Sequence, residues 1–139
     1  MESFASVEPL SNFDIIAKCK ELQIKNFKGV FMRDELNKNK ASNNECLVLN
    51  IDDSSNEGTH WTCLFIQNNI CIYFDSFGFP PPVEVEQYCY QINERCYNSD
   101  RIQKAGQVIC GHFCIYMLYK LSNGFDFYRV LDELYRLNN

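Results

Sequence analysis

The chain has 139 residues, the size of one ordinary domain, which leaves no room for a second fold and a linker. Hydrophobic residues at 46% and aromatic residues at 14% are sufficient for a closed core and argue against disorder. Thirteen basic against eighteen acidic residues give a net charge of −5, so no broad basic face for nucleic acid is expected. We therefore predict one domain over residues 1–139, monomeric, with DNA binding weak or absent.

Eight cysteines would suggest disulfides in a small secreted protein. The first residues, however, are acidic and contain neither the basic nor the apolar region of a signal peptide, and no apolar run approaches the roughly 18 residues of a membrane span. We therefore expect an intracellular protein, neither secreted nor membrane-bound, in which most cysteines are small core residues. Zinc is the alternative, but no C-x2-C pair occurs and Cys110-Gly-His-Phe-Cys114 is the one close Cys/His cluster, so no metal is expected.

Hydrophobic periodicity predicts helices separated by strands. Apolar residues at helical spacing predict helices over about 12–23, 83–94 and 110–121, and a final amphipathic helix through Phe127–Leu134. Apolar runs of strand length predict strands over 46–51, 60–66 and 70–75, and a further short strand within 96–103. Residues 25–44 are mixed and Asn-rich, and are predicted to be largely irregular. The order of these elements predicts an α+β layered domain.

The strands over 60–66 and 70–75 form a predicted hairpin with a two-residue turn, because Asn tolerates positive φ. If the turn is Gln67-Asn68, His60 lies directly opposite Asp75. If the turn is Asn68-Asn69, Asp75 is the diagonal neighbour of His60. Either register puts both side chains on one face with Cβ atoms about 4.5–8 Å apart, within reach of a hydrogen bond. The carboxylate would then fix the imidazole tautomer and favour its protonated form.

Cys110 is predicted at the N-terminus of an apolar helix, where unpaired N–H groups and the helix dipole stabilise a thiolate. Gly111 beside it leaves room for the approach of a substrate. With His60 as base and Asp75 as the group that orients it, Cys110 completes a set suited to acyl transfer. His112 points about 200° away from Cys110 around the helix axis, so it is a poor base. A core cysteine, a surface histidine and a turn aspartate are the alternative interpretation.

Three segments carry a pattern in chain order: Gly58-Thr-His60-Trp61, then Tyr73-Phe-Asp75-Ser-Phe-Gly-Phe79, then Gln103 with Ile109-Cys110-Gly-His-Phe-Cys114. They resemble the adenovirus endopeptidase family, adenain, and its relatives in Polinton/Maverick elements and adintoviruses, within the wider group of Ulp-type SUMO proteases. The resemblance implies a papain-like, Ulp-type fold. In that fold helices pack on a central mixed β-sheet, and the nucleophile stands at the N-terminus of the central helix.

The resemblance also implies a role for each matching residue. Cys110 would be the nucleophile, His60 the general base and Asp75 its orienting carboxylate. Gln103 would give its side-chain amide to the oxyanion hole, beside the backbone N–H of Cys110. Gln107, three residues before Cys110, is the competing candidate for this position.

Two further positions follow from the resemblance. Trp61 would flank the substrate channel, with a core aromatic as the alternative. Cys96 lies roughly where adenain has the cysteine that joins a short activating viral peptide through a disulfide; a buried structural cysteine is the alternative. Adenain is also stimulated by DNA, and the acidic charge of this chain argues against that effect here.

The function that the resemblance implies is a cysteine endopeptidase that cleaves viral capsid or core precursors after small residues, often Gly. It would act in the nucleus or cytoplasm of a host cell and in the virion, with no cofactor apart from an activating peptide. An isopeptidase that removes ubiquitin-like modifiers is one alternative. A non-catalytic peptide-binding module of the same fold is the other.

Overall fold

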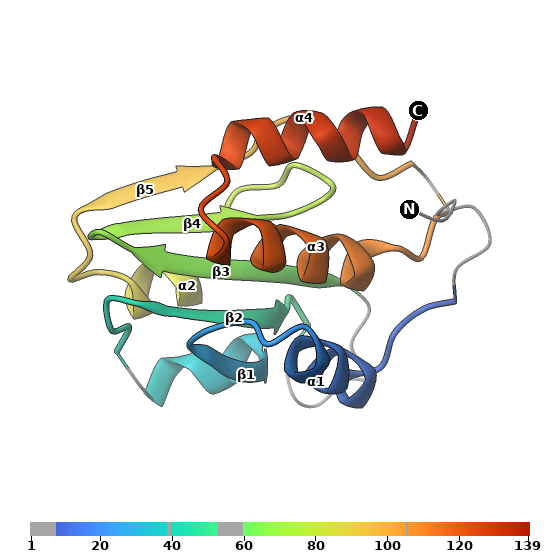
Figure 1. Cartoon of the computed structure of the whole chain (residues 1–139). Helices are drawn as coiled ribbons and strands as arrows, with labels where there is room; N and C mark the ends of the chain where they lie inside the picture. The colour runs from blue at the N-terminus through green and yellow to red at the C-terminus, as the bar shows by residue number, and fades with distance from the viewer. Residues whose placement is uncertain (1–7, 39, 53–59, 105) are drawn as a thin grey trace.

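A five-stranded mixed sheet forms the centre of the computed structural model, which describes residues 8–38, 40–52, 60–104 and 106–139 (Figure 1). The strands, in spatial order, are β1 (Phe27–Met32), β2 (Glu45–Asn50), β3 (Trp61–Gln67), β4 (Ile70–Phe74) and β5 (Glu94–Tyr97). The outer pairs, β1 with β2 and β4 with β5, are parallel, whereas β2, β3 and β4 are antiparallel. The helices are α1 (Asn12–Glu21), the 3-10 helix η2 (Arg33–Lys38), α2 (Val83–Tyr88), α3 (Cys110–Ser122) and α4 (Phe127–Leu137). The predicted α+β fold with a mixed central sheet is confirmed.

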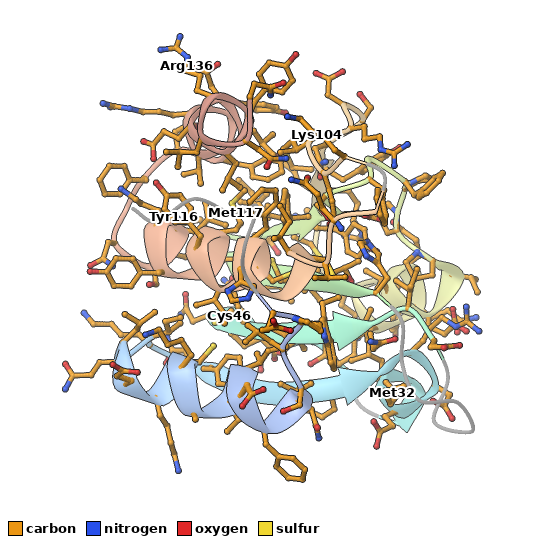
Figure 2. All side chains as sticks on the ribbon, turned by 90° about the vertical axis from the view of Figure 1, so that its right-hand side faces the viewer. Met32, Cys46, Lys104, Tyr116, Met117 and Arg136 are labelled. Atoms are coloured by element: carbon orange, nitrogen blue, oxygen red, sulfur yellow. The ribbon has the colours of Figure 1, made fainter. Side chains whose placement is uncertain are left out.

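The sheet separates two hydrophobic layers. Helices α1, α3 and α4 cover one face, where Met117 of α3 and Cys46 of β2 belong to one buried cluster, while Arg136 of α4 points outward (Figure 2). Helices η2 and α2 cover the other face, with Leu36 and Val85 in its cluster. Strand β2 gives alternate residues to the two layers, so all of its residues are buried. This agrees with the prediction of a strand that is covered on both faces.

A two-residue turn at Asn68-Asn69 joins β3 to β4. Both residues have positive φ, 54° and 61°, as a type I′ hairpin turn requires. Gln67 pairs with Ile70, and the same register continues along the hairpin. Of the two predicted registers the structure therefore has the second, in which Asp75 is the diagonal neighbour of the position of His60.

The segment 25–44, predicted to be largely irregular, contains β1 and η2, so that prediction was wrong. Strand β1 lies at one edge of the sheet and has a register shift between Phe27 and Gly29, whose φ is 139°. The shift disturbs the alternation of buried and exposed side chains, and most residues of β1 are half-buried. The strand consequently has no clear period of two in the sequence.

The helix predicted over 83–94 was too long, because α2 ends at Tyr88 and β5 begins at Glu94. Beyond the end of α2, the Cys89 carbonyl accepts the N–H of Ile92 at 2.9 Å, and the guanidinium of Arg95 donates to the carbonyl oxygens of Cys89 and Ile92. Cys89 and Ile92 still face the core after the helix has ended, so their spacing looks helical in the sequence. The further strand predicted within 96–103 lies earlier in the chain, at Glu94–Tyr97.

Helix α3 begins at Cys110, in agreement with the helix predicted over 110–121. Most of its residues are buried between the sheet and α4, which explains why it is apolar nearly all round. A turn at Gly124, with a φ of 88°, leads to α4, whose N-cap Asp126 accepts a hydrogen bond from the backbone N–H of Arg129. No helix within the described ranges is long and apolar enough to cross a membrane.

The start of α1 generates a stability prediction. Ser11 Oγ accepts a hydrogen bond from the N–H of Asp14 at 3.1 Å, and Asp14 Oδ2 accepts one from the N–H of Ser11 at 2.9 Å. Because Ser11→Ala removes one half of this capping box, we expect the free energy of unfolding to fall by about 1 kcal/mol in urea denaturation. Ser122→Ala, which removes an exposed hydroxyl at the end of α3, is the control. Equal losses in the two variants would contradict the capping role.

Candidate active site

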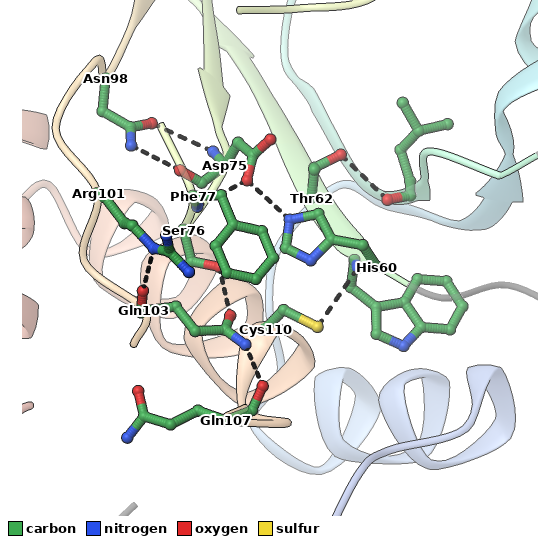
Figure 3. A network of polar contacts seen from close by, with 12 residues as sticks. His60, Thr62, Asp75, Ser76, Phe77, Asn98, Arg101, Gln103, Gln107 and Cys110 are labelled. Atoms are coloured by element: carbon green, nitrogen blue, oxygen red, sulfur yellow. Dashed lines mark hydrogen bonds and ion pairs between the residues drawn. The ribbon is translucent and has the colours of Figure 1, made fainter. Parts of the chain in front are cut away.

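Three candidate residues meet at one end of the sheet (Figure 3). His60 directly precedes β3, Asp75 directly follows β4, and Cys110 is the first residue of α3, which packs on β3. Their exposed fractions are 5%, 1% and 8%, respectively. The β3–β4 hairpin brings the first two together, and the packing of α3 adds the third. A histidine, a carboxylate and a thiol are thus enclosed where hydrogen bonds and charges act more strongly than in water.

The carboxylate of Asp75 is held in place from several sides. His60 Nε2 lies 2.7 Å from Asp75 Oδ1, which confirms the predicted contact. The same oxygen accepts a hydrogen bond from the backbone N–H of Phe77 at 2.8 Å. Asn98 clamps the Asp75 backbone, because its Oδ1 accepts from Asp75 N at 3.1 Å and its Nδ2 donates to Asp75 O at 2.6 Å. With Nε2 engaged by Asp75, Nδ1 is the ring atom that remains for Cys110.

The turn after Asp75 shields the imidazole. The rings of Phe77 and His60 are stacked with centroids 4.5 Å apart, and the Arg101 guanidinium lies 4.9 Å from the centroid of the Phe77 ring. Gly78 ends the turn with a φ of 77°, and a Cβ at this position would lie 2.6 Å from the carbonyl oxygen of Ser99. Only glycine suits both the conformation and this close approach. The turn 75–78 is therefore packed tightly against the segment 98–103.

The electrostatic setting of Cys110 favours a thiolate. Its Sγ accepts a hydrogen bond from the backbone N–H of Trp61 at 3.5 Å. Burial opposes charge on Cys110, but hydrogen bonds from the His60 side chain and the Trp61 backbone outweigh it and lower the pKa of the thiol from its usual value. Burial also opposes charge on His60, yet hydrogen bonds to Asp75 and Cys110 raise its pKa to about 9. Both shifts favour a thiolate–imidazolium pair.

Most of the other cysteines lie in the core, as predicted: the buried ones are Cys19, Cys46, Cys63, Cys71, Cys89 and Cys114. Burial raises the pKa of Cys19 and that of Cys46 to about 12, and it raises the pKa of Cys114 well above its usual value. The pKa of the Cys110 thiol is therefore shifted in the opposite direction to the pKa of these three cysteines. Within the described residues no group of three or more His, Cys, Asp or Glu side chains could hold a metal ion.

The two glutamines proposed for an oxyanion hole have different surroundings. Gln103 is 2% exposed, its Oε1 accepts a hydrogen bond from Ser76 Oγ at 2.6 Å, and its Nε2 donates to the Gln107 carbonyl. Its amide points to the side of Cys110, whereas the side chain of Gln107 points away (Figure 3). The Gln107 amide instead bonds to the Asn138 side chain and to the N–H of Lys104. Only Gln103 of the two thus directs its amide to the candidate site.

Gly111, expected to leave room for a substrate, is buried. The space that a side chain would occupy is lined by other residues of the protein. A Cβ there would lie 3.2 Å from Trp61 and 3.4 Å from Leu10. Gly111 therefore permits α3 to pack closely on its neighbours, and its role beside a substrate stays a prediction. Trp61 is half-buried beside it, and its indole N–H donates to the carbonyl of Leu10 at 3.1 Å. His112 Nε2 lies 2.9 Å from the carbonyl oxygen of Glu8, and not at the site.

Cys96 is half-buried on β5, at the opposite edge of the sheet from β1. Its Sγ lies 3.2 Å from the hydroxyl of Tyr128 on α4. Cys96 is therefore more exposed than the other seven cysteines, which are buried, and it lies apart from the site around His60. Gly58, which opens the first sequence motif, lies outside the described residues.

Sequence reasoning missed Asn98 and Ser76, which hold the candidate acid and the candidate amide. Asn98 falls in a segment predicted to contain a strand, and an isolated Asn there gives no functional signal. Ser76 follows Asp75 directly, so its place inside the second motif was the available indication. The stacking of Phe77 on His60 depends on the path of the turn, which the sequence does not fix.

Comparison with known proteins gives matches in structure. No family profile matches the chain, and no curated protein matches it in sequence. Two structures of the ASFV pS273R protease match with TM-scores of 0.67 and 0.62 at 16% and 15% identity, over 99% of this chain and 68% and 69% of theirs. A structure of the SUMO protease Ulp1 with its catalytic cysteine oxidised to a sulfonic acid matches with a TM-score of 0.50 at 12% identity, over 98% of this chain and 78% of that chain.

These matches confirm the predicted fold, that of the Ulp-type cysteine proteases. They extend over nearly the whole chain, so the sheet and the helices on both of its faces belong to the shared architecture. Because one fold hosts many activities, the function has to be argued from the side chains at the site.

The site generates a prediction about thiol reactivity. In a Cys96→Ser background at pH 7, iodoacetamide should alkylate Cys110 faster than any of the six core cysteines, as measured by peptide mass spectrometry. His60→Ala should slow the labelling of Cys110 about tenfold or more, because an ordinary thiol is only a few per cent thiolate at this pH. His112→Ala, which removes the other histidine, should leave the rate unchanged. Equal slowing in the two histidine variants would contradict the pairing of Cys110 with His60.

Proposed function

We propose that this protein is a cysteine endopeptidase in which Cys110 is the nucleophile, His60 the proton carrier and Asp75 the residue that orients His60. The observation that carries the proposal is the buried hydrogen bond between His60 Nε2 and Asp75 Oδ1, with the lowered pKa of the neighbouring Cys110 thiol. A protein that only binds peptides has no need to keep three ionisable groups buried and connected. The arrangement is that of an activated nucleophile.

The proposed reaction starts from the thiolate–imidazolium pair. The Cys110 thiolate attacks the scissile carbonyl carbon, and the electron pair of the C=O bond moves onto the oxygen. Collapse of this intermediate breaks the C–N bond, and His60 gives its proton to the leaving amine. A water molecule then attacks the thioester with His60 as base, which releases the acid and restores the thiolate. Asp75 keeps the imidazole oriented through both steps.

Two donors are suited to the oxyanion. The backbone N–H of Cys110 belongs to the first turn of α3, where N–H groups have no partner within the helix. The amide of Gln103 is buried and bonded at its oxygen, so it is preorganised before the substrate binds. Each such donor stabilises the transition state by about 3 kcal/mol.

The proposed substrates are viral capsid or core precursors, cleaved after small residues, often Gly, in an extended segment. The motif resemblance to adenain and the fold shared with the ASFV pS273R protease support this proposal. A narrow channel suits glycine, because a residue without Cβ lets the backbone pass between bulky walls. Trp61, half-buried beside His60, is proposed as one such wall. We propose the host cell nucleus or cytoplasm and the virion as the places of action.

An isopeptidase that removes ubiquitin-like modifiers is the second candidate. Its support is the fold similarity to the SUMO protease Ulp1, and modifier tails that end in Gly-Gly would suit the same channel. The chemistry at Cys110 is identical for the two activities. They differ in whether the leaving amine comes from a main chain or from a lysine side chain.

We also propose an activating viral peptide as a partner, bound beside β5. A groove of about 630 Å³ lies between the segment 97–102 and α4, and Tyr97, Tyr128 and Tyr135 line it. Cys96 contacts Tyr128 at this groove and is proposed as the tether for a disulfide with the peptide. Strand β5 is an edge strand, so it has backbone groups available for an extended ligand. The net charge of −5 argues against DNA as a second activator.

The proposed activity generates a prediction on cleavage. The wild type should cleave capsid precursors encoded by the same genome and a fluorogenic peptide ending in Gly-Gly, whereas Cys110→Ala should abolish both activities. Gln103→Ala should lower kcat by about 10²- to 10³-fold. Gln91→Ala is the matched control, because Gln91 is an exposed glutamine outside the candidate site, and it should leave kcat unchanged. Cleavage of isopeptide-linked conjugates alone would favour the isopeptidase. Equal rates for the wild type and Cys110→Ala would contradict both proposed activities.

The pKa shifts generate a prediction on pH dependence. kcat/KM should rise as Cys110, with its lowered pKa, becomes a thiolate, and fall near pH 9 as His60 loses the proton that the leaving amine requires. Asp75→Asn removes a group that raises the pKa of His60, so the descending limb should move to lower pH and kcat should drop. Glu21→Gln, at an exposed ion pair on α1, is the control. An unchanged descending limb in Asp75→Asn would show that the carboxylate does not act on His60.

A further inference from the structure

A buried hydroxyl binds the oxygen end of the Gln103 amide. Ser76 is 0% exposed, and its Oγ donates a hydrogen bond to Gln103 Oε1 at 2.6 Å. The backbone carbonyl of Ser76 also accepts hydrogen bonds from the N–H groups of Ile102 at 2.8 Å and of Gln103 at 2.9 Å. Ser76 therefore holds both the main chain and the side chain of Gln103.

Two contacts together hold the amide in one orientation. A primary amide has an oxygen that only accepts hydrogen bonds and an NH2 group that only donates them. The Gln107 carbonyl can only accept, so its contact requires the NH2 group of Gln103 on that side. The Ser76 hydroxyl then donates to the amide oxygen and holds the amide in this orientation, which leaves the second N–H group for another acceptor. A reversed amide would present its oxygen, with partial negative charge, at the place where the substrate oxyanion develops.

We propose that Ser76 is a positioning residue that holds the Gln103 amide in place, with its NH2 group facing the oxyanion of the substrate. The inference rests on the proposed peptidase function and deepens it. Ser76 acts through Gln103 and does not itself touch the substrate. It follows Asp75 in the chain, so a single turn orients the imidazole by one residue and the oxyanion donor by the next.

A double-mutant cycle tests this inference with the fluorogenic peptide ending in Gly-Gly. Ser76→Ala should lower kcat about tenfold and change KM less, below the 10²- to 10³-fold loss expected for removal of the donor in Gln103→Ala. Because Ser76 acts through Gln103, the double variant should have the kcat of Gln103→Ala alone. Ser76→Cys keeps a side chain of similar length with a weaker donor, and it should give an intermediate kcat. This variant takes the place of Ser76→Ala if Ser76→Ala fails to fold.

Two further measurements separate positioning from a general structural role. The Cys110 thiolate adds to the carbonyl carbon of a peptide aldehyde ending in Gly-Gly, and the C=O electron pair moves onto the oxygen. Because this adduct carries the same oxyanion, the affinity for the aldehyde should fall together with kcat in Ser76→Ala. Alkylation by iodoacetamide displaces iodide and develops no oxyanion, so its rate and pH profile should stay unchanged. Thr62→Val, which removes a buried hydroxyl that donates to the Leu49 carbonyl at 3.0 Å, should alter neither kcat nor aldehyde affinity.

The outcomes distinguish the inference from the proposed function. If the wild type cleaves neither the peptide nor the precursors, the proposed function fails and the role of Ser76 fails with it. If the wild type is active and Ser76→Ala has the same kcat, only the role of Ser76 is overturned. The same conclusion follows if the losses from Ser76→Ala and Gln103→Ala multiply in the double variant, or if alkylation slows together with kcat.

Discussion

The register of the β3–β4 hairpin is the constraint on which the candidate site depends. The turn at Asn68-Asn69 sets this register, and it leaves His60 and Asp75 as diagonal neighbours at the open end of the hairpin. A slip of one residue would turn Asp75 to the other face of the sheet, because side chains alternate along a strand. His60 would then be buried without its carboxylate. A local choice of turn residues thus determines the electrostatics of a site several residues away.

Burial and hydrogen bonding act against each other throughout the site. Water is largely excluded from His60, Asp75 and Cys110, which by itself disfavours every charged form. The contacts between these side chains reverse that preference for the thiol and the imidazole, whose shifts both favour the ion pair. For Cys19 and Cys46 in the core, burial raises the pKa to about 12 and keeps the thiols neutral. The same residue type is therefore inert in the core and activated at the start of α3.

The sequence predicted the parts of the fold that have a regular period, including β2, the hairpin and α3. It failed for β1, where a register shift between Phe27 and Gly29 disturbs the period, and for the end of α2, where Cys89 and Ile92 still face the core after the helix has ended. Within the site, the pair of His60 and Asp75 followed from strand geometry. The contacts of Asn98 and Ser76 did not, because they join segments whose relative position depends on the packing of two irregular turns. The packing role of Gly111 did not follow from the sequence either, because its neighbours Trp61 and Leu10 are distant in the chain.

The glycine at position 78 has a mechanical consequence. The turn 75–78 and the segment 98–103 are joined by hydrogen bonds at Asp75 and Ser76, and at Gly78 they approach so closely that no side chain fits between them. The two segments are therefore packed as one unit, in which the turn carries Asp75 and the other segment carries Gln103. A displacement of either segment would disturb the carboxylate and the Gln103 amide together. A substitution at Gly78 would thus reach both the group that orients His60 and the candidate oxyanion donor, although Gly78 touches neither.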